Sequence, residues 1–400
     1  MRYRFWLLLA PLLAIGITTA AWSQDGDESG KHAGKCDPAK GHCVSTIVFS
    51  STRDHMDLLP NPALNFMEIY RLSMNGDGTP NMDTLVRLTE TERIACTDPT
   101  FVSCVFGGNF FPKLSPDGKR IVFDSFRDRA PGEPRLTSSL FLMKSDGSDQ
   151  RPLTRGNAAT WSPDGKYIAF HASASGAVCP VSTPPPFPGI PGCSTAVALG
   201  ASTWDSDIFI MRVPDDDEGI EAPINLTNTP SHIEDDADWS PDGKKIVFVR
   251  RAVTAGFPEA EICVLTLETS AVECLALNNE ERAPTWSPDG GRIAYMCRNP
   301  TNNAFEICVV NVDGTGRMQL TNDAVVDATP GWSPDGEKIV WGKGMTGVAV
   351  LWLVNPDGTG LTRLDIPPVT PGTSTGANLA PSWGWLWVGG KSHDQNAGGR

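Results

Sequence analysis

An acidic run in the middle of the chain has the residue types for chemistry. His232 is followed closely by Glu234, Asp235, Asp236 and Asp238. Two carboxylates can act as general acid and general base when their surroundings separate their pKa values. The run therefore makes a hydrolase or lyase one hypothesis. Because carboxylates are often clustered without doing chemistry, we expect a binding protein rather than an enzyme, with no cofactor.

Other motifs that resemble catalytic or metal sites are better explained as turns. Gly372, Ser374 and Gly376 match G-x-S-x-G, but a nucleophile elbow needs a strand before the serine and a helix after it. This stretch is instead rich in Pro, Thr and Gly. The acidic stretches 215–218 and 75–83 lack the bidentate glutamate of a calcium loop. We therefore expect no catalytic residue and no metal site.

The ten cysteines indicate disulfides and an oxidising compartment. The sequence contains no C-x-x-C pair, and its six histidines are scattered, which argues against zinc. Neighbouring cysteines pair off along the chain, and each closes a short loop. The expected pairs are Cys36 with Cys43, Cys96 with Cys104, Cys179 with Cys193, Cys263 with Cys274, and Cys297 with Cys308.

One phrase recurs and organises the chain. It reads L-S-P-D-G from Leu114, and W-S-P-D-G from Trp161, Trp239, Trp286 and Trp332. Most steps are about 47 residues, the length of one unit of four short strands. One longer step contains a proline-rich insertion from about Ala172 to Thr203, which cannot join a sheet ladder and so predicts a loop.

Each unit has the same internal order. An alternating apolar run follows the Pro-Asp-Gly turn, a variable loop and a second run come next, and an Asp-Gly turn and a Leu-Thr pair end the unit. Proline presets the turn, aspartate bonds the following backbone, and glycine takes a positive φ, so the Pro-Asp-Gly motif is expected to be structural. We expect the tryptophan before it, or Leu114, to pack between neighbouring units.

These residues resemble the PD40 (WD40-like) repeat of TolB-like six-bladed β-propellers. The resemblance covers nearly all of the chain after its first residues and implies an all-β fold of six blades. The first unit, from about Ser45, lacks its leading segment, and the stretch from Ala380 to Trp385 can supply it. We therefore expect a ring closed by the C-terminal strand joining the first blade.

The N-terminus predicts export. Arg2 and Arg4 precede an apolar run and small residues, which is typical of a secretory signal peptide. The expected organisation is a signal peptide at 1–23, an N-terminal segment at 24–44, the propeller at 45–388 and a disordered tail at 389–400. The apolar run is too short to span a membrane. We expect a periplasmic or secreted monomer with no membrane span.

The net charge of −14 argues against nucleic acid as a partner, because a polyanion requires a basic face. Variable loops on a rigid scaffold commonly carry binding. We therefore expect an envelope or extracellular protein, peptide or glycan to bind at the face opposite the Pro-Asp-Gly turns. The expected ligand-binding residues are Glu234, Asp235, Asp236, Asp238, His232, Arg282, Asp327, Phe110 and Trp204. The same face also carries Asn109, Arg127, His171, Arg250, Arg251, Arg298 and Glu281.

Overall fold

The computed structural model describes residues 43–52, 67–90, 108–127, 138–173, 206–215, 220–252, 260–277, 280–344, 349–366 and 378–388. The chain divides into two units, Met1–Ala33 and Gly34–Arg400, and every described residue belongs to the second. Within the described residues, no helix is long and apolar enough to cross a membrane.

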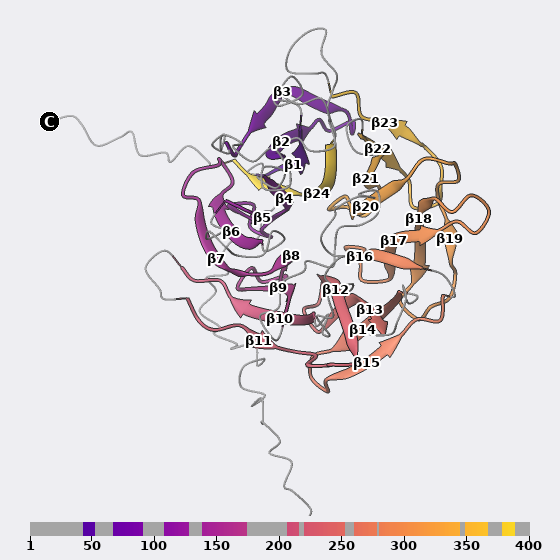
Figure 1. Ribbon diagram of the computed structural model, residues 1–400. Helices are drawn as coiled ribbons and strands as arrows, with labels where there is room; N and C mark the ends of the chain where they lie inside the picture. Colours follow the sequence, from indigo (N-terminus) through magenta and orange to yellow (C-terminus); the bar gives the residue numbers. More distant parts are fainter. Residues whose placement is uncertain are drawn as a thin grey trace, which may run out of the picture. The chain divides into compact units, whose positions relative to one another are not determined.

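The described residues form six four-stranded antiparallel sheets, which are the blades of a β-propeller (Figure 1). This confirms the predicted fold class. The innermost strands surround the centre of the ring in Figure 1. They are β24 (Asn378–Trp387), β4 (Asn109–Leu114), β8 (Asn157–Trp161), β12 (His232–Trp239), β16 (Glu281–Trp286) and β20 (Asp327–Trp332) for blades 1 to 6.

The other three layers follow outward in every blade. The second strands are β1 (Cys43–Ser51), β5 (Arg120–Ser125), β9 (Tyr167–Ala172), β13 (Lys245–Ala252), β17 (Arg292–Arg298) and β21 (Ile339–Lys343). The third strands are β2 (Glu68–Met74), β6 (Ser139–Lys144), β10 (Asp207–Arg212), β14 (Glu261–Thr266), β18 (Phe305–Asn311) and β22 (Val350–Val354). The outer strands are β3 (Pro80–Arg87), β7 (Arg151–Arg155), β11 (Ile224–Asn225), β15 (Ala271–Cys274), β19 (Met318–Gln319) and β23 (Thr362–Arg363).

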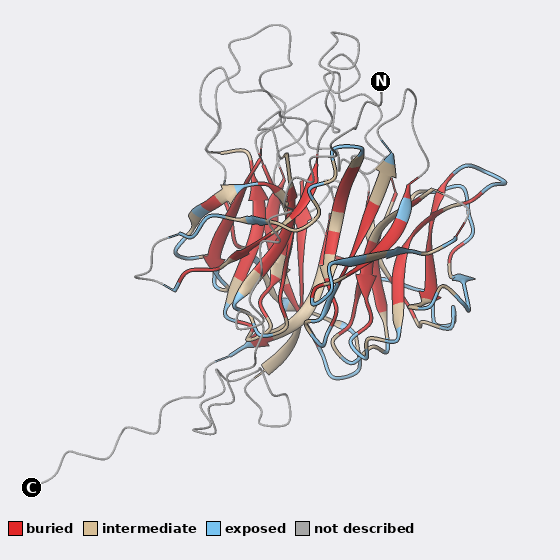
Figure 2. Cartoon of the chain, turned by 90° about the horizontal axis from the view of Figure 1, so that it is seen from below, coloured by how far each residue is buried: buried red, intermediate tan, exposed pale blue. Residues whose placement is uncertain are grey.

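The core lies between blades. Trp161 of blade 3 packs on Val122 and Leu140 of blade 2, and its indole donates a hydrogen bond to the Lys113 carbonyl at 3.0 Å. Leu114 takes the equivalent place against blade 1, as the sequence predicts. Burying one such indole stabilises the fold by on the order of 4 kcal/mol. Figure 2 shows this burial concentrated along the strands, with exposed residues at their turns and outer edges.

The Pro-Asp-Gly turns join the first and second strands by one repeated hydrogen-bond pattern. In blade 3, Ser162 Oγ donates to Asp164 Oδ1 at 2.6 Å, and that oxygen also accepts from the Lys166 amide at 3.0 Å. Gly165 has a φ of 70°, which glycine adopts without strain. The structural interpretation of the motif is confirmed. We call this end of the ring the turn end and the opposite end the loop end.

The chain closes in blade 1, where β24 pairs with β1. Trp383 Nε1 donates to Ser45 Oγ at 2.7 Å across 338 positions of sequence. This is the strand that the stretch from Ala380 to Trp385 predicts. It gives blade 1 its fourth strand, so this blade is built from both ends of the described chain.

Candidate functional site

All six inner strands carry a β-bulge near the loop end, where the register against the second strand shifts. One residue in each strand has a positive φ, and all six values lie between 47° and 53°. These residues are Phe111, Ala158, Asp236, Ala283, Thr329 and Ala380. Five are small or apolar, and only blade 4 places a carboxylate there. A bulge re-aims side chains, so this departure changes the chemistry at the centre of the ring.

The residue two positions before the bulge makes the same kind of structural contact in several blades. In three blades, an acid or amide there pairs with a cation from the second strand or its end. The pairs are Asn109 with Arg127 at 2.7 Å, Glu234 with Arg250 at 2.6 Å, and Asp327 with Lys343 at 3.0 Å. The repetition indicates that Glu234 and Asp327 hold the blade together.

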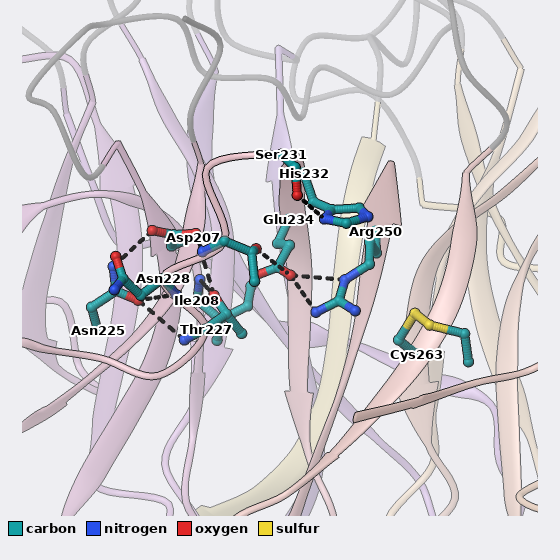
Figure 3. A network of polar contacts seen from close by, with 12 residues as sticks. Asp207, Ile208, Asn225, Thr227, Asn228, Ser231, His232, Glu234, Arg250 and Cys263 are labelled. Carbon is teal, nitrogen blue, oxygen red and sulfur yellow. Dashed lines mark hydrogen bonds and ion pairs between the residues drawn. A yellow bond between two sulfur atoms is a disulfide. The ribbon is translucent and has the colours of Figure 1, made fainter. Parts of the chain in front are cut away.

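The contacts of Glu234 extend this structural role to the neighbouring blade (Figure 3). Its Oε1 accepts from Thr229 Oγ1 and from Arg250 Nε, each at 2.9 Å. The Thr229 amide in turn donates to Asp207 Oδ1 at 3.0 Å, and Asp207 also accepts from Asn225. Glu234 is fully buried and links the connection between blades 3 and 4 to β13.

The next two residues belong to a different group, which we call the central charged cluster: His171, Asp235, Asp236, Arg251, Glu280 and Arg282. Asp235, which is 1% exposed, forms an ion pair with Arg251. Arg282 forms an ion pair with Glu280, which also binds Arg298.

Asp236 joins the cluster across three blades. Its Oδ2 accepts from the Ala283 amide of blade 5 at 3.2 Å, and its own amide donates to His171 Nδ1 of blade 3 at 3.4 Å. These contacts and its charge interaction with Arg282 place Asp236 in the same cluster as Asp235 and Arg282.

Burial dominates the electrostatics of the cluster. Burial and the charge of Arg251 lower the pKa of His171 to about 3, so this imidazole is neutral at pH 7. Burial and the charge of Arg282 lower the pKa of Arg251 to about 9, against the opposing effect of Glu280, and Arg251 stays charged. Burial raises the pKa of Asp236, although Arg282, the Ala283 amide and Lys113 oppose the shift.

Asp124, on β5, adds a second buried carboxyl beside the cluster. It accepts from the Ala158 amide at 2.9 Å and 3.1 Å. Burial raises its pKa well above the ordinary value, and the charge of Asp236 adds to the shift. Asp124 and Glu280 are not among the site residues that the sequence predicts. Asp124 directly follows the apolar run that ends at Phe123. A carboxyl at that position in a buried strand is the signal that could have revealed it.

Asp238 lies two residues beyond Asp236 and has a different role. Its Oδ1 accepts from Thr160 Oγ1 of blade 3 at 2.7 Å. Its Oδ2 accepts from Thr285 Oγ1 at 3.0 Å and from the Trp286 amide at 2.8 Å, both in blade 5. Asp238 thus ties three blades together with its hydrogen-bonding capacity largely used.

The remaining candidates have their contacts elsewhere. His232 Nδ1 lies 2.9 Å from Ser231 Oγ at the start of β12. Phe110 makes an edge contact with Phe126, with ring centroids 5.6 Å apart, and packs on the apolar group that includes Leu379. Trp204 lies outside the described residues.

Two of the expected disulfides are present. Cys263 pairs with Cys274 between β14 and β15, and Cys297 pairs with Cys308 between β17 and β18. Cys43 is also disulfide-bonded. The other five cysteines lie outside the described residues. Among the residues that the structure describes, the one group with metal-ligand geometry is Glu261 with Cys263 and Cys274, whose sulfurs are already joined.

Comparisons with known proteins agree with the fold. The family model PD40, described as the TolB beta propeller domain, matches residues 190–384. The Tol-Pal system protein TolB of Anaeromyxobacter sp. (strain K) is 29% identical over 137 residues, which are 34% of this chain and 28% of that protein. The chain therefore matches only a minor part of this relative's length.

Two solved structures share the fold. TolB from Acinetobacter baumannii has a TM-score of 0.56 at 19% identity, with 85% of this chain and 66% of that chain covered. Kuenenia stuttgartiensis hydrazine synthase has a TM-score of 0.54 at 15% identity, with 88% of this chain and 49% of that chain covered. At these identities the likeness concerns the fold, which by itself does not assign a function.

Proposed function

We propose that this six-bladed β-propeller, which is similar to the TolB beta propeller domain, works as an exported module that binds a protein or peptide at the loop end of its ring. The observation that carries the proposal is the central charged cluster. Its residues depart from the repeat in blades 4 and 5, whereas the surrounding contacts recur from blade to blade.

The arrangement of charges favours binding over catalysis. Asp235 and Glu280 are held on arginine side chains, which leaves them poorly placed to transfer protons to a substrate. The inner strands are fixed on both sides by neighbouring blades, so the cluster is held by a rigid scaffold. A preorganised polar cluster lowers the ordering cost of binding a partner.

Export is supported by the residues of the expected signal peptide and by the disulfides, which persist in oxidising compartments. The relative named as a Tol-Pal system protein makes an envelope protein a reasonable class of partner. N-terminal sequencing of the secreted or periplasmic protein tests this part of the proposal. A mature chain that still begins at Met1 would contradict export.

Affinity capture tests the binding function. The mature protein is immobilised, exposed to envelope extract and compared with Arg282→Gln, which changes the cluster. Arg363→Gln serves as the control, because Arg363 lies on the outer strand β23 and is 51% exposed. We expect a partner that the wild type and the control retain and that Arg282→Gln loses. Equal capture by all three proteins, or capture of none, would overturn binding at the loop end.

A second candidate, a hydrolase or lyase, is favoured by one observation. Asp124 and Asp236 are buried carboxyls with raised pKa values, and the charge of Asp236 adds to the shift of Asp124. Two carboxyls whose surroundings separate their pKa values can act as general acid and general base. Turnover of peptide or glycan substrates that is lost in both Asp124→Asn and Asp236→Asn would support this candidate.

A further inference from the structure

Arg251 and Arg282 are buried cations with unused donors. Their side chains are only 11% and 12% exposed. Each guanidinium uses one terminal nitrogen in an ion pair, Arg251 with Asp235 and Arg282 with Glu280. The Nε–H of each is buried and has no hydrogen-bond partner in the part of the chain that the structure describes. An unpaired buried donor is unfavourable, so both sites favour an added acceptor.

The two guanidinium groups also repel each other. Arg282 is a cause of the lowered pKa of Arg251, which places the two charges within interaction range. The neighbouring His171 is neutral at pH 7, so its charge does not offset the repulsion between the two guanidinium groups. Two like charges held together in a buried site are relieved by an anion that binds both.

The surrounding carboxyls set the charge of that anion. Asp235 and Glu280 already neutralise much of the local positive charge, and Asp236 interacts electrostatically with Arg282. A phosphate dianion would meet strong repulsion from these groups. A carboxylate carries one charge and two acceptor oxygens, which match the geometry of guanidinium donors.

We propose that Arg251 and Arg282 together bind a carboxylate of the partner protein, from an Asp or Glu side chain or from a C-terminus. This inference rests on the proposed function and names the chemistry that the partner presents. The carboxylate approaches the exposed 11% and 12% of the two side chains, and a small outward shift of each guanidinium lets its Nε–H donate to the carboxylate. Blade 4 supplies Arg251 and blade 5 supplies Arg282, so the partner is bound across a blade junction.

Titration of the mature protein with defined peptides tests the inference. The probes are N-acetylated and C-amidated tetraglutamate, the matching tetraglutamine, tetraglycine with a free C-terminus, and inorganic phosphate. We expect tetraglutamate to bind, tetraglutamine to fail, and added salt to weaken the complex. Tetraglycine distinguishes a C-terminal carboxylate from a side chain. Phosphate that binds as well as tetraglutamate would overturn the assignment to a carboxylate.

Two variants locate the site. Arg282→Gln should weaken tetraglutamate binding by about tenfold or more, and Arg282→Lys should weaken it less, because lysine retains the charge but loses the planar fork. The double variant Asp235→Asn with Arg251→Gln removes a complete ion pair and avoids an unpaired buried charge. Arg363→Gln is the control. Thermal melts establish that each variant is folded.

The outcomes separate this inference from the proposed function. If tetraglutamate binds all folded variants equally, the arginine pair is not the site, and the inference fails. If the envelope partner is still captured in that case, the binding function stands without it. If the wild-type protein captures no partner and binds no peptide, both proposals are overturned.

Discussion

The two ends of the ring differ in how their contacts repeat. At the turn end, the same serine, aspartate and glycine contacts recur in five blades with hydrogen bonds of nearly constant length. At the loop end, the bulges recur, but the residues at and around them change from blade to blade. Repetition marks what the fold requires, and departure from it marks candidates for recognition. Four predictions test this comparison.

The largest effect is expected from Gly118→Ala at the turn end. Gly118 has a φ of 71°, and an added Cβ would lie 2.3 Å from the Trp385 carbonyl oxygen and 2.5 Å from the Trp387 nitrogen of β24. Alanine is strained at this positive φ, and its Cβ clashes with the backbone of β24. Together these effects should lower the free energy of unfolding by about 4 kcal/mol. Denaturant unfolding measures the change.

Gly165→Ala is the matched control for Gly118. Gly165 has a φ of 70°, but its added Cβ would meet only Pro116 Cδ, at 3.7 Å. It should cost about 1 kcal/mol, the strain alone. Equal effects at the two glycines would show that the closing strand does not press on the turn of blade 2.

Asp238→Ala should have the next largest effect, although an aspartate does not recur at this position in the other blades. The change leaves Thr160, Thr285 and the Trp286 amide without their shared acceptor. We expect a loss of about 3 kcal/mol in the free energy of unfolding. Asp236→Asn, two residues away, should change stability little, since the amide oxygen can still accept from Ala283. The reverse order of effects would exchange the assigned roles of the two aspartates.

The two observed disulfides give a comparison at matched loop length, because both join cysteines 11 residues apart. Replacing either pair with alanine should cost about 2 to 3 kcal/mol. Only loss of Cys297 and Cys308 should also weaken partner capture, because Cys297 precedes Arg298, which binds Glu280 of the cluster. Weakened capture on loss of Cys263 and Cys274 would show that stability alone controls binding.

The smallest effect at neutral pH is expected from His171→Gln. The folded pKa is about 3 and the ordinary value is 6.5, so between these values the unfolded chain binds a proton that the folded chain does not. The contribution of His171 to stability therefore grows as the pH rises through this window, and it is fully present above it. The variant should lose this contribution, whose slope is at most about 1.4 kcal/mol per pH unit.

His232→Gln is the control for His171, because His232 lies at the start of β12, where its Nδ1 contacts the neighbouring Ser231 Oγ in an exposed position. Thermal melts across pH 3 to 7 measure both variants. Asp124 acts with the opposite sign, since its raised pKa makes stability fall as pH rises above the ordinary value for aspartate. An unchanged pH profile in His171→Gln would mean that His171 is protonated in the folded protein.

Sequence reasoning predicted what repeats. Blades, turns and the packing of tryptophans between blades follow from local patterns that each recur several times. Sequence reasoning could not predict the bulges, because a strand pattern contains only the strict alternation of side chains.

The sequence also could not predict which charged residues pair with each other. Arg250 and Arg251 are adjacent, yet they bind Glu234 and Asp235 separately, and only the register of β12 against β13 decides which pair forms. Asp236 and Asp238 are two positions apart, a spacing that strand alternation puts on one face. Both do reach blades 3 and 5, but through a bulge and to different partners.

The shared first blade has a kinetic consequence. Contact between Ser45 and Trp383 requires closure of almost the whole propeller, since 338 positions separate them. The entropy of closing such a loop is on the order of 5 kcal/mol, and folds rich in distant contacts form slowly. Five blades can assemble from neighbouring strands, but the sixth must wait for the last strand. The chain can therefore remain open during synthesis and lock into a ring only after β24 has been made.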